Sequence, residues 1–268
     1  MTPAVTAVLE SWRLAPGFAL LLGVTGVLYL RGWAKVRRQL PAQFPTWRLM
    51  AFLGGLALLY IAVASPLDAF AGLLLQVHMV QHLLLMTAAP ALLLLGAPAV
   101  PLLRGLPTGV AKDGLGPFLA APEVRRLADV LSHPLFCWLA MSAATWFWHT
   151  PSPYQLALRS PLWHEVEHAA FLTAGLLFWW PVVQPWPSRA RWPEWTIPVY
   201  LLLADVQNTA LAALLVFSER LLYPIYGEVP RLAGESAQND QVAAGLFMWV
   251  PMSLVYLIPA AVITMRLL

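Results

Sequence analysis

Hydrophobic residues along this chain form long runs that are separated by shorter polar segments rich in proline. An apolar run of about 18 or more residues predicts a membrane-spanning helix, because about 20 residues cross the hydrocarbon layer. The sequence therefore predicts an all-α integral membrane protein, a single domain over residues 1–268 built as a bundle of seven transmembrane helices. The predicted spans cover approximately residues 16–33, 47–65, 70–95, 134–150, 162–183, 196–218 and 242–265.

Composition points to the same class of protein. Sixty percent of the residues are hydrophobic and 11% are charged, whereas soluble domains carry about 25% charged residues. Disordered chains, nucleic-acid-binding arms and ordinary soluble enzymes are therefore poor fits. We predict a multi-pass protein of the cell membrane, with the lipid bilayer as its environment and no nucleic-acid partner. Cys137 is the single cysteine, which excludes an internal disulfide and a CxxC motif.

The distribution of basic residues predicts the orientation of the bundle. With the N-terminus outside and the C-terminus cytoplasmic, the cytoplasmic segments hold 12 of the 16 Lys and Arg residues and the outer segments hold four. Such an excess on the cytoplasmic side is typical of membrane proteins. The longer cytoplasmic loop, 96–133, is predicted to include a surface helix at Glu123–Leu131, and the longer outer loop spans 219–241.

The histidines are the main candidates for chemistry, since all six lie in or at the edge of predicted spans. His78 and His82 are four residues apart on one helix, and so are His164 and His168, so each pair shares a helix face. His149 lies at the end of the fourth span. Intramembrane polar groups usually face the bundle interior and mark function. We predict a metal site on the outer side with these five residues as ligands; the alternative is that each histidine only hydrogen-bonds a neighbouring helix.

The depth of the two pairs leaves open whether they form one site or two. Ser65 to Asp68 form a helix-start signal, with a capping serine and a proline at the first helical position. A continuous helix from that point would place His78 about 15 Å below Asp68. His164 lies only one turn below the start of its helix. The spacing therefore predicts an offset in depth, which His149 would bridge.

Softer ligands nearby favour copper. Imidazole binds Zn, Cu, Fe and Ni alike, whereas thioethers select Cu(I). Met86 lies one turn beyond His82, and Met248 and Met252 share a face of the seventh helix. These methionines are auxiliary ligand candidates for copper, either Cu(I) or Cu(II), although methionine also commonly fills gaps in a core.

Two acidic residues are further auxiliary candidates. Asp205 lies within the sixth span, where it could relay protons, bind metal or pair with a histidine. Asp240 lies at the start of the seventh span. A helix cap is the simpler interpretation of this position, and a role as a metal ligand or in docking is the functional alternative. His133 and Cys137 form another pair toward the inner side, for which a buried structural cysteine is the simpler interpretation.

Two other metal chemistries compete with copper. His164-Glu165-x-x-His168 matches the HExxH pattern of zinc metalloproteases, in which the glutamate is the general base. This alternative leaves His78, His82 and His149 unused. Histidines on facing helices can also clamp haem iron, but that needs small residues near the ligands, and Leu and Trp dominate here.

Several blocks of sequence follow one another from the second or third predicted span to the seventh. They are His78-Met79-Val80-Gln81-His82-Leu83-Leu84-Leu85-Met86 with Ala89-Pro90 and Leu95-Gly96-Ala97-Pro98; Trp148-His149-x-Pro151 with Tyr154 and Ala157-Leu158; His164-x-x-x-His168 with Phe171 and Gly175-Leu176-Leu177-Phe178-Trp179-Trp180-Pro181-Val182; and Asp240-Gln241, Ala244-Gly245-Leu246 and Met248-Trp249. In this order they resemble the caa3-type cytochrome c oxidase assembly factor family, the Bacillus-type CtaG proteins.

The resemblance implies a seven-helix membrane protein that is needed to mature a haem–copper terminal oxidase. Its expected partners are cytochrome c oxidase subunits or another copper-delivery protein on the outer side. Such an assembly factor would handle metal without covalent catalysis, so we do not expect an enzyme. Copper binding is our own inference from the histidines, and a metal-free assembly scaffold stays open as an alternative. The oligomeric state is not predicted.

Overall fold

The computed structural model describes residues 10–12, 15–188, 192–231 and 234–268, and their regular structure is entirely helical. Its long helices are α2 (Pro16–Gln39), α3 (Thr46–Ala64), α10 (Pro134–His149), α12 (Pro161–Val183), α13 (Thr196–Phe217) and α15 (Ala237–Leu267). Shorter elements are α4 (Pro66–Ala71), α5 (Leu75–Leu83), the π-helical turn η1 (Leu84–Ala88), α6 (Ala89–Leu95), α7 (Ala99–Gly105), the π-helical turn η2 (Val110–Leu115), α8 (Gly116–Ala120), α9 (Pro122–Leu131), α11 (Pro151–Arg159) and α14 (Ile225–Glu228).

Six stretches of helix within the described residues are long and apolar enough to cross a membrane: α2, α3, the continuous stretch Leu75–Leu95, α12, α13 and α15. A seventh span results if α9 and α10, which meet at a bend of 64°, are counted as one. The expectation of a multi-pass helical bundle is thus supported, and each predicted span coincides with one of these helices or with α10. Which end of the bundle faces the outside of the cell stays a prediction.

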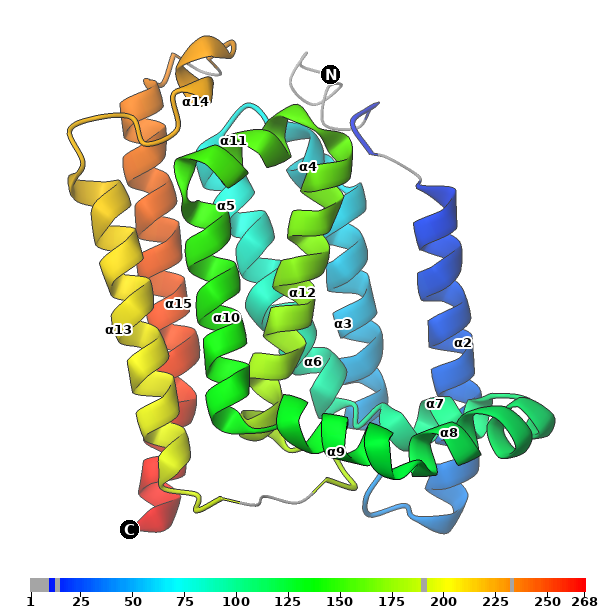
Figure 1. The fold of residues 1–268 in the computed structure, drawn as a ribbon. Coiled ribbons are helices and arrows are strands. Elements are labelled where there is room, and N and C mark those ends of the chain that lie inside the picture. Colours follow the sequence, from blue (N-terminus) through cyan, green and yellow to red (C-terminus); the bar gives the residue numbers. More distant parts are fainter. Residues whose placement is uncertain (1–9, 13–14, 189–191, 232–233) are drawn as a thin grey trace.

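The long helices stand roughly side by side, with α13 and α15 at one edge of the bundle and α2 at the other (Figure 1). The short helices α4, α11 and α14 lie at one end of the bundle. At the opposite end, α7, α8 and α9 run across the direction of the long helices (Figure 1). We call the first end the α11 end and the second the α9 end.

The third predicted span begins later than the sequence suggests. Ser65 does cap a helix, since its hydroxyl accepts a hydrogen bond from the Leu67 N–H at 3.2 Å, but that helix is the short α4. The chain then breaks at residues 72–74, and α5 starts afresh at Leu75. The predicted continuous helix is therefore two helices, which changes the depth of every residue after the break.

A π-helical turn interrupts the same span beside α12. Pro90 has no N–H to offer to the carbonyl of Met86, four residues earlier, so that acceptor is available to another group. The Trp179 indole N–H donates to it at 3.1 Å. A Cβ on Gly175 would lie 2.6 Å from the same carbonyl oxygen, so glycine is what lets α12 approach this closely. The turn thereby fixes α12 against the α5–α6 stretch.

The crossing of α2 and α7 is also a direct backbone contact. A Cβ on Gly32 would lie 1.7 Å from the Pro101 carbonyl oxygen, and one on Gly105 would lie 1.9 Å from the Leu28 carbonyl oxygen. Neither position can carry a larger side chain without separating the helices. This crossing anchors the segment that leads into α8 and α9, where the predicted surface helix is observed at Pro122–Leu131.

Candidate metal site

Three helices bring the predicted ligands together near the α11 end of the bundle. His78 and His82 lie on successive turns of α5, His164 and His168 on the first two turns of α12, and His149 is the last residue of α10. His78, His82, His149 and His168 are buried, and His164 is partly exposed. The two pairs face each other: ring centroids are 5.4 Å apart for His78 and His164, and 6.3 Å for His82 and His168.

The predicted depth offset between the pairs is wrong. A continuous helix would have separated His78 from Asp68 along its axis, but the chain breaks between α4 and α5, so this separation does not arise. Asp68 instead lies beside the cluster, with one carboxylate oxygen 4.0 Å from the His164 Nδ1. Gln81 holds Asp68 there, since its amide donates to that carboxylate at 3.1 Å and to the Ala62 carbonyl at 2.7 Å.

A carboxylate that sequence reasoning did not assign lies in the middle of the cluster. Glu167 is fully buried, and its two oxygens lie 3.5 Å from the His78 Nε2 and 3.6 Å from the His82 Nε2. Neither oxygen has a hydrogen-bond partner among the described residues. A negative charge sealed among imidazoles in a membrane bundle needs a compensating positive charge, from a protonated histidine or from a bound cation.

The spacing in sequence contained the signal for Glu167. Residues three and four apart share a helix face, so His164, Glu167 and His168 all point to one side of α12. The HExxH interpretation drew attention to Glu165 instead. The Glu165 side chain is exposed, whereas Glu167 is buried and faces the histidines.

The ligand atoms are close enough together for one metal ion. Three groups within the described residues each place their nitrogen or oxygen atoms within 4.8 Å of one another. They share members and form one continuous cluster: His78, His82 and His168; Asp68, His164 and His168; and His78, His164 and Glu167. This buried histidine cluster can bind a metal ion, and the geometry alone does not select which metal.

His149 belongs to none of these three groups but lies next to them. Its ring centroid is 6.0 Å from that of His82. Its Nδ1 lies 2.7 Å from the Thr145 carbonyl oxygen, which can only accept, so Nδ1 carries the proton. The Nε2 lone pair is therefore free of a proton, and this buried atom has no hydrogen-bond partner among the described residues. His149 thus has the tautomer of a metal ligand.

Two tyrosines complete the surroundings of His78. The hydroxyls of Tyr154 and Tyr226 lie 3.0 and 3.1 Å from the His78 Nδ1 and 3.0 Å from each other. Tyr226 donates its proton to the Ala71 carbonyl at 2.8 Å. Burial raises the pKa of both phenols well above 10, so they remain protonated at neutral pH. A hydroxyl oxygen of this pair can therefore accept a hydrogen bond from the His78 Nδ1–H, which leaves Nε2 as the ligand atom.

Asp240 holds the first turn of α5 rather than its own helix. Its oxygens accept hydrogen bonds from the N–H groups of Leu75 at 2.9 Å and Gln76 at 3.0 Å, and Arg231 pairs with it at 3.3 Å. Ser236 instead caps α15, through a hydrogen bond to the Asn239 N–H. Asp240 thereby fixes the start of the helix that carries His78 and His82.

The predicted methionines surround a small cavity of about 20 Å³ beside His82 and His149, which has room for about one water molecule. Met86, Met248 and Met252 all line it, and so does Met79, which sequence reasoning did not assign to the site. Asp205 belongs to none of the three groups, and it accepts a hydrogen bond from Ser253 at 2.6 Å.

His133 and Cys137 make contacts that serve local structure. His133 caps α10, since its Nδ1 accepts a hydrogen bond from the Leu135 N–H at 3.2 Å. The Cys137 thiol is buried and donates to the Leu131 carbonyl at 3.1 Å. Both contacts stabilise the bend between α9 and α10.

Comparisons with known proteins identify the family of this chain. The family description of cytochrome c oxidase caa3 assembly factors matches residues 27–268. Uncharacterized proteins of Mycobacterium bovis and Mycobacterium tuberculosis are each 32% identical over 201 residues, which is 71% of this chain and 29% of theirs. An uncharacterized protein of Mycobacterium leprae is 27% identical over 259 residues, covering 92% of this chain and 38% of its own.

This chain therefore spans less than two fifths of the length of these curated relatives. No solved structure matches it. The family match begins within α2, continues to residue 268, and includes every helix that contributes to the histidine cluster. The chain belongs to the cytochrome c oxidase caa3 assembly factor family.

Proposed function

We propose that this protein binds copper in the buried histidine cluster and passes it on during assembly of a haem–copper cytochrome c oxidase. The observation that carries the proposal is the convergence of five imidazoles and the Glu167 carboxylate in one buried place. In this proposal copper is the cargo of the protein, and no covalent catalysis takes part.

The charge of Glu167 favours a cation over a purely structural cluster. Hydrogen bonding would satisfy buried histidines if they served only to hold helices together. Here Glu167 and the Nε2 atoms of His82, His149 and His168 have no hydrogen-bond partner among the described residues. A metal ion bound in the cluster would give some of these atoms a partner and would compensate the charge of the carboxylate.

The neighbouring thioethers favour copper over zinc. The cluster offers nitrogen and oxygen ligands, which suit Cu(II) and zinc alike. The adjoining cavity adds the sulfur atoms of Met79, Met86, Met248 and Met252, which suit Cu(I) but not zinc. His82 belongs to both sets, so a copper ion held by His82 can draw on either kind of ligand.

The position of the cluster fits delivery toward one side of the membrane. It lies near the α11 end, which the distribution of basic residues predicts to be the outer end (Figure 1). In this orientation copper would pass to or from a partner on the outer side. That partner would be an oxidase subunit or a separate copper-delivery protein.

Three alternatives predict different behaviour. A zinc protease that uses His164-Glu165-x-x-His168 would lose proteolysis on Glu165→Gln and keep its metal. A haem protein would purify coloured, with a Soret band. A metal-free scaffold would support oxidase assembly even after the histidines are replaced.

The central experiment measures bound metal in the purified full-length protein. Wild type and the His82→Ala/His168→Ala variant are loaded with Cu(I) or Zn(II), freed of excess metal, and analysed for metal per chain. We expect copper near one or two per chain in the wild type and a loss of most of it in the double variant. A His133→Ala variant is the matched control, because His133 lies at the other end of α10 and should leave copper unchanged.

A second measurement asks whether the copper site matters for assembly. The same variants are expressed in cells that lack the wild-type protein, and the copper content of the purified oxidase is determined. We expect copper-deficient oxidase with His82→Ala/His168→Ala and normal oxidase with His133→Ala. Absence of copper from the wild-type protein, together with normal oxidase in the double variant, would refute the proposal and favour a metal-free scaffold.

A further inference from the structure

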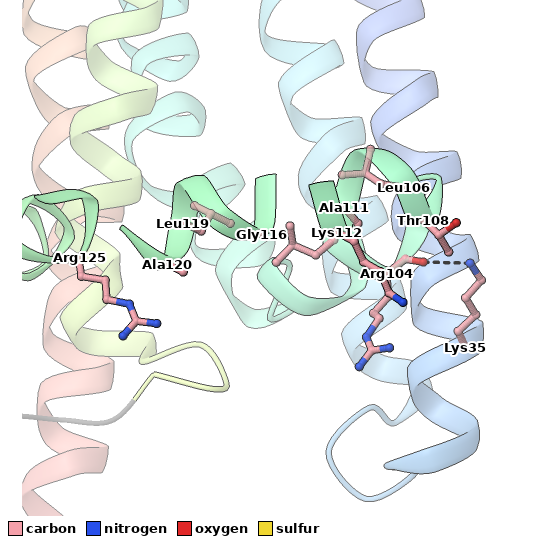
Figure 2. Close-up of a pocket in the computed structure, with 11 residues that line it drawn as sticks. Lys35, Arg104, Leu106, Thr108, Ala111, Lys112, Gly116, Leu119, Ala120 and Arg125 are labelled. Atoms are coloured by element: carbon pink, nitrogen blue, oxygen red, sulfur yellow. Dashed lines mark hydrogen bonds between the residues drawn. The ribbon is translucent and has the colours of Figure 1, made fainter. Parts of the chain in front are cut away.

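A second region, at the opposite end of the bundle from the histidine cluster, has the character of a binding site. A pocket of about 710 Å³ lies between α2, α7, η2, α8 and α9 (Figure 2). Among the residues that the structure describes, four that line the pocket are basic and none that line it is acidic; the basic ones are Lys35, Arg104, Lys112 and Arg125. In Figure 2, Arg125 approaches from α9 on one side, and Lys35 and Arg104 lie on the other.

The backbone holds these charges in place. The contact of Gly32 and Gly105 fixes α7 across α2, as described above, and Arg104 is the residue next to that contact. The Lys35 ammonium donates a hydrogen bond to the Arg104 carbonyl at 3.0 Å. This contact holds Lys35 of α2 against the backbone of Arg104, so both basic residues lie on the same side of the pocket, which suits an anion with several oxygen acceptors.

Most of the other residues in the lining are apolar. Leu103, Leu106 and Leu119 line the pocket together with alanine and glycine residues and Thr108. Next to it, Phe118 is 60% exposed, and Leu127 and Val130 of α9 are each 56% exposed. These short helices run across the ends of the spanning helices (Figure 1), as helices do that lie in the interface of a bilayer with their apolar side in the acyl chains.

We propose that this pocket binds an anionic phospholipid, with its headgroup against the basic side chains that line the pocket and its acyl chains along the leucines. Charge complementarity selects an anionic headgroup, and the exposed apolar side chains beside the pocket select a lipid over a soluble phosphate. The same residues lie in segments that are predicted to face the cytoplasm, where anionic lipids attract basic clusters. This site is independent of the copper site.

The test is a titration of the purified full-length protein in neutral detergent, with bound lipid counted by native mass spectrometry. Phosphatidylglycerol and phosphatidylcholine are compared as probes, and no charged bilayer is present to attract basic residues at long range. Lys112→Gln/Arg125→Gln removes two charges from the pocket. Arg38→Gln/Arg126→Gln removes two exposed charges that do not line it and is the matched control.

We expect phosphatidylglycerol to bind the wild type in preference to phosphatidylcholine. The pocket variant should lose affinity about 10-fold or more, as expected for the loss of charge-assisted hydrogen bonds, while the control changes little. Equal losses in both variants, or equal binding of both lipids, would overturn the proposal. Inorganic phosphate and glycerol phosphate are tested as competitors, and binding of either as tight as that of phosphatidylglycerol would assign the pocket to a soluble anion instead. Unchanged helix content by circular dichroism shows that the variants are folded.

Discussion

At the scale of single residues, the charge of Glu167 distinguishes a metal site from a set of packed histidines. Its carboxylate is buried between His78 and His82 and belongs to one of the three groups that can hold an ion. Replacing it by glutamine keeps the volume and removes the charge. A bound cation would then lose its neutralising ligand, and a network of neutral imidazoles would gain a hydrogen-bond donor.

We therefore predict that Glu167→Gln weakens metal binding by about 10-fold or more, as expected for the loss of a charged contact in a buried site. Glu165→Gln is the matched comparison, because it makes the same change at an exposed position on the same helix. It should leave metal binding unchanged. Competition with a coloured copper chelator measures both affinities. If the two variants had the same metal affinity, Glu167 would not be a ligand, and the metal site would have to be assigned to other residues.

The tyrosines behind His78 have a separate expected effect on metal affinity. Loss of a hydrogen-bond partner of a ligand histidine typically lowers metal affinity by about 10- to 100-fold. We predict that Tyr154→Phe lowers copper affinity within this range, because His78 loses one of the two hydroxyls that can accept a hydrogen bond from its Nδ1–H. The Tyr60→Phe variant, which alters a tyrosine of α3 outside these contacts, should bind copper like the wild type in the same chelator assay. An unchanged affinity in Tyr154→Phe would show that Tyr226 alone orients the ring.

At the scale of helices, the start of α5 depends on a residue 165 positions away in the chain, since Asp240 accepts the N–H of Leu75. Asp240 also accepts the N–H of Gln76 and pairs with Arg231. An aspartate at a helix N-terminus compensates its unsatisfied N–H groups and its dipole. Here the compensating group comes from another helix, so it also connects α15 and Arg231 to the helix that carries His78 and His82.

We predict that Asp240→Asn lowers the free energy of unfolding by about 1.5–3 kcal/mol, the value of a hydrogen bond to a charged group. Copper affinity should fall as well, because α5 positions His78 and His82. Thermal unfolding in detergent and the chelator assay measure the two effects. Glu228→Gln removes an exposed carboxylate from the same region and should change neither. A fall in copper affinity with no loss of stability would point to Asp240 as a direct ligand.

The helices were largely predictable from the sequence, and their breaks were not. Hydropathy located the spans because the bilayer imposes their length. The break at residues 72–74 gave no such signal, since those residues are as apolar as the helices around them, and only the distant Asp240 shows why α5 starts at Leu75. The error in depth for His78 followed directly from this break. The π-helical turn before Pro90 likewise depends on Trp179 and Gly175 of another helix.

For the candidate ligands too, some features were predictable from the sequence and others depend on helix packing. Pairs spaced by four were recognisable because a helix places them on one face. That the two pairs meet, and that Glu167 lies between them, depends on how α5 and α12 pack. The roles of Tyr154 and Tyr226 also come from packing, since they join His78 from segments far apart in sequence. A sequence pattern therefore predicts which residues are neighbours along one helix, but not which residues of different helices are in contact.

At the scale of the whole molecule, both proposed sites depend on the orientation of the bundle. The histidine cluster lies toward the α11 end and the basic pocket lies at the α9 end (Figure 1). The excess of Lys and Arg in the segments of the α9 end predicts that this end faces the cytoplasm. Copper exchange would then occur at the outer face, and the lipid would bind in the inner leaflet.

We predict that a membrane-impermeant maleimide labels a cysteine at the α11 end in intact spheroplasts and one at the α9 end only after lysis. In a Cys137→Ala background, Glu219→Cys and Arg126→Cys place single thiols at exposed positions near opposite ends of the bundle. Cys137→Ala alone is the control for background labelling. The reverse pattern would place the histidine cluster on the cytoplasmic side, so copper would then have to be received from the cytoplasm. Lipid binding in detergent and copper binding by the purified protein would be unaffected by that result, because neither measurement depends on orientation.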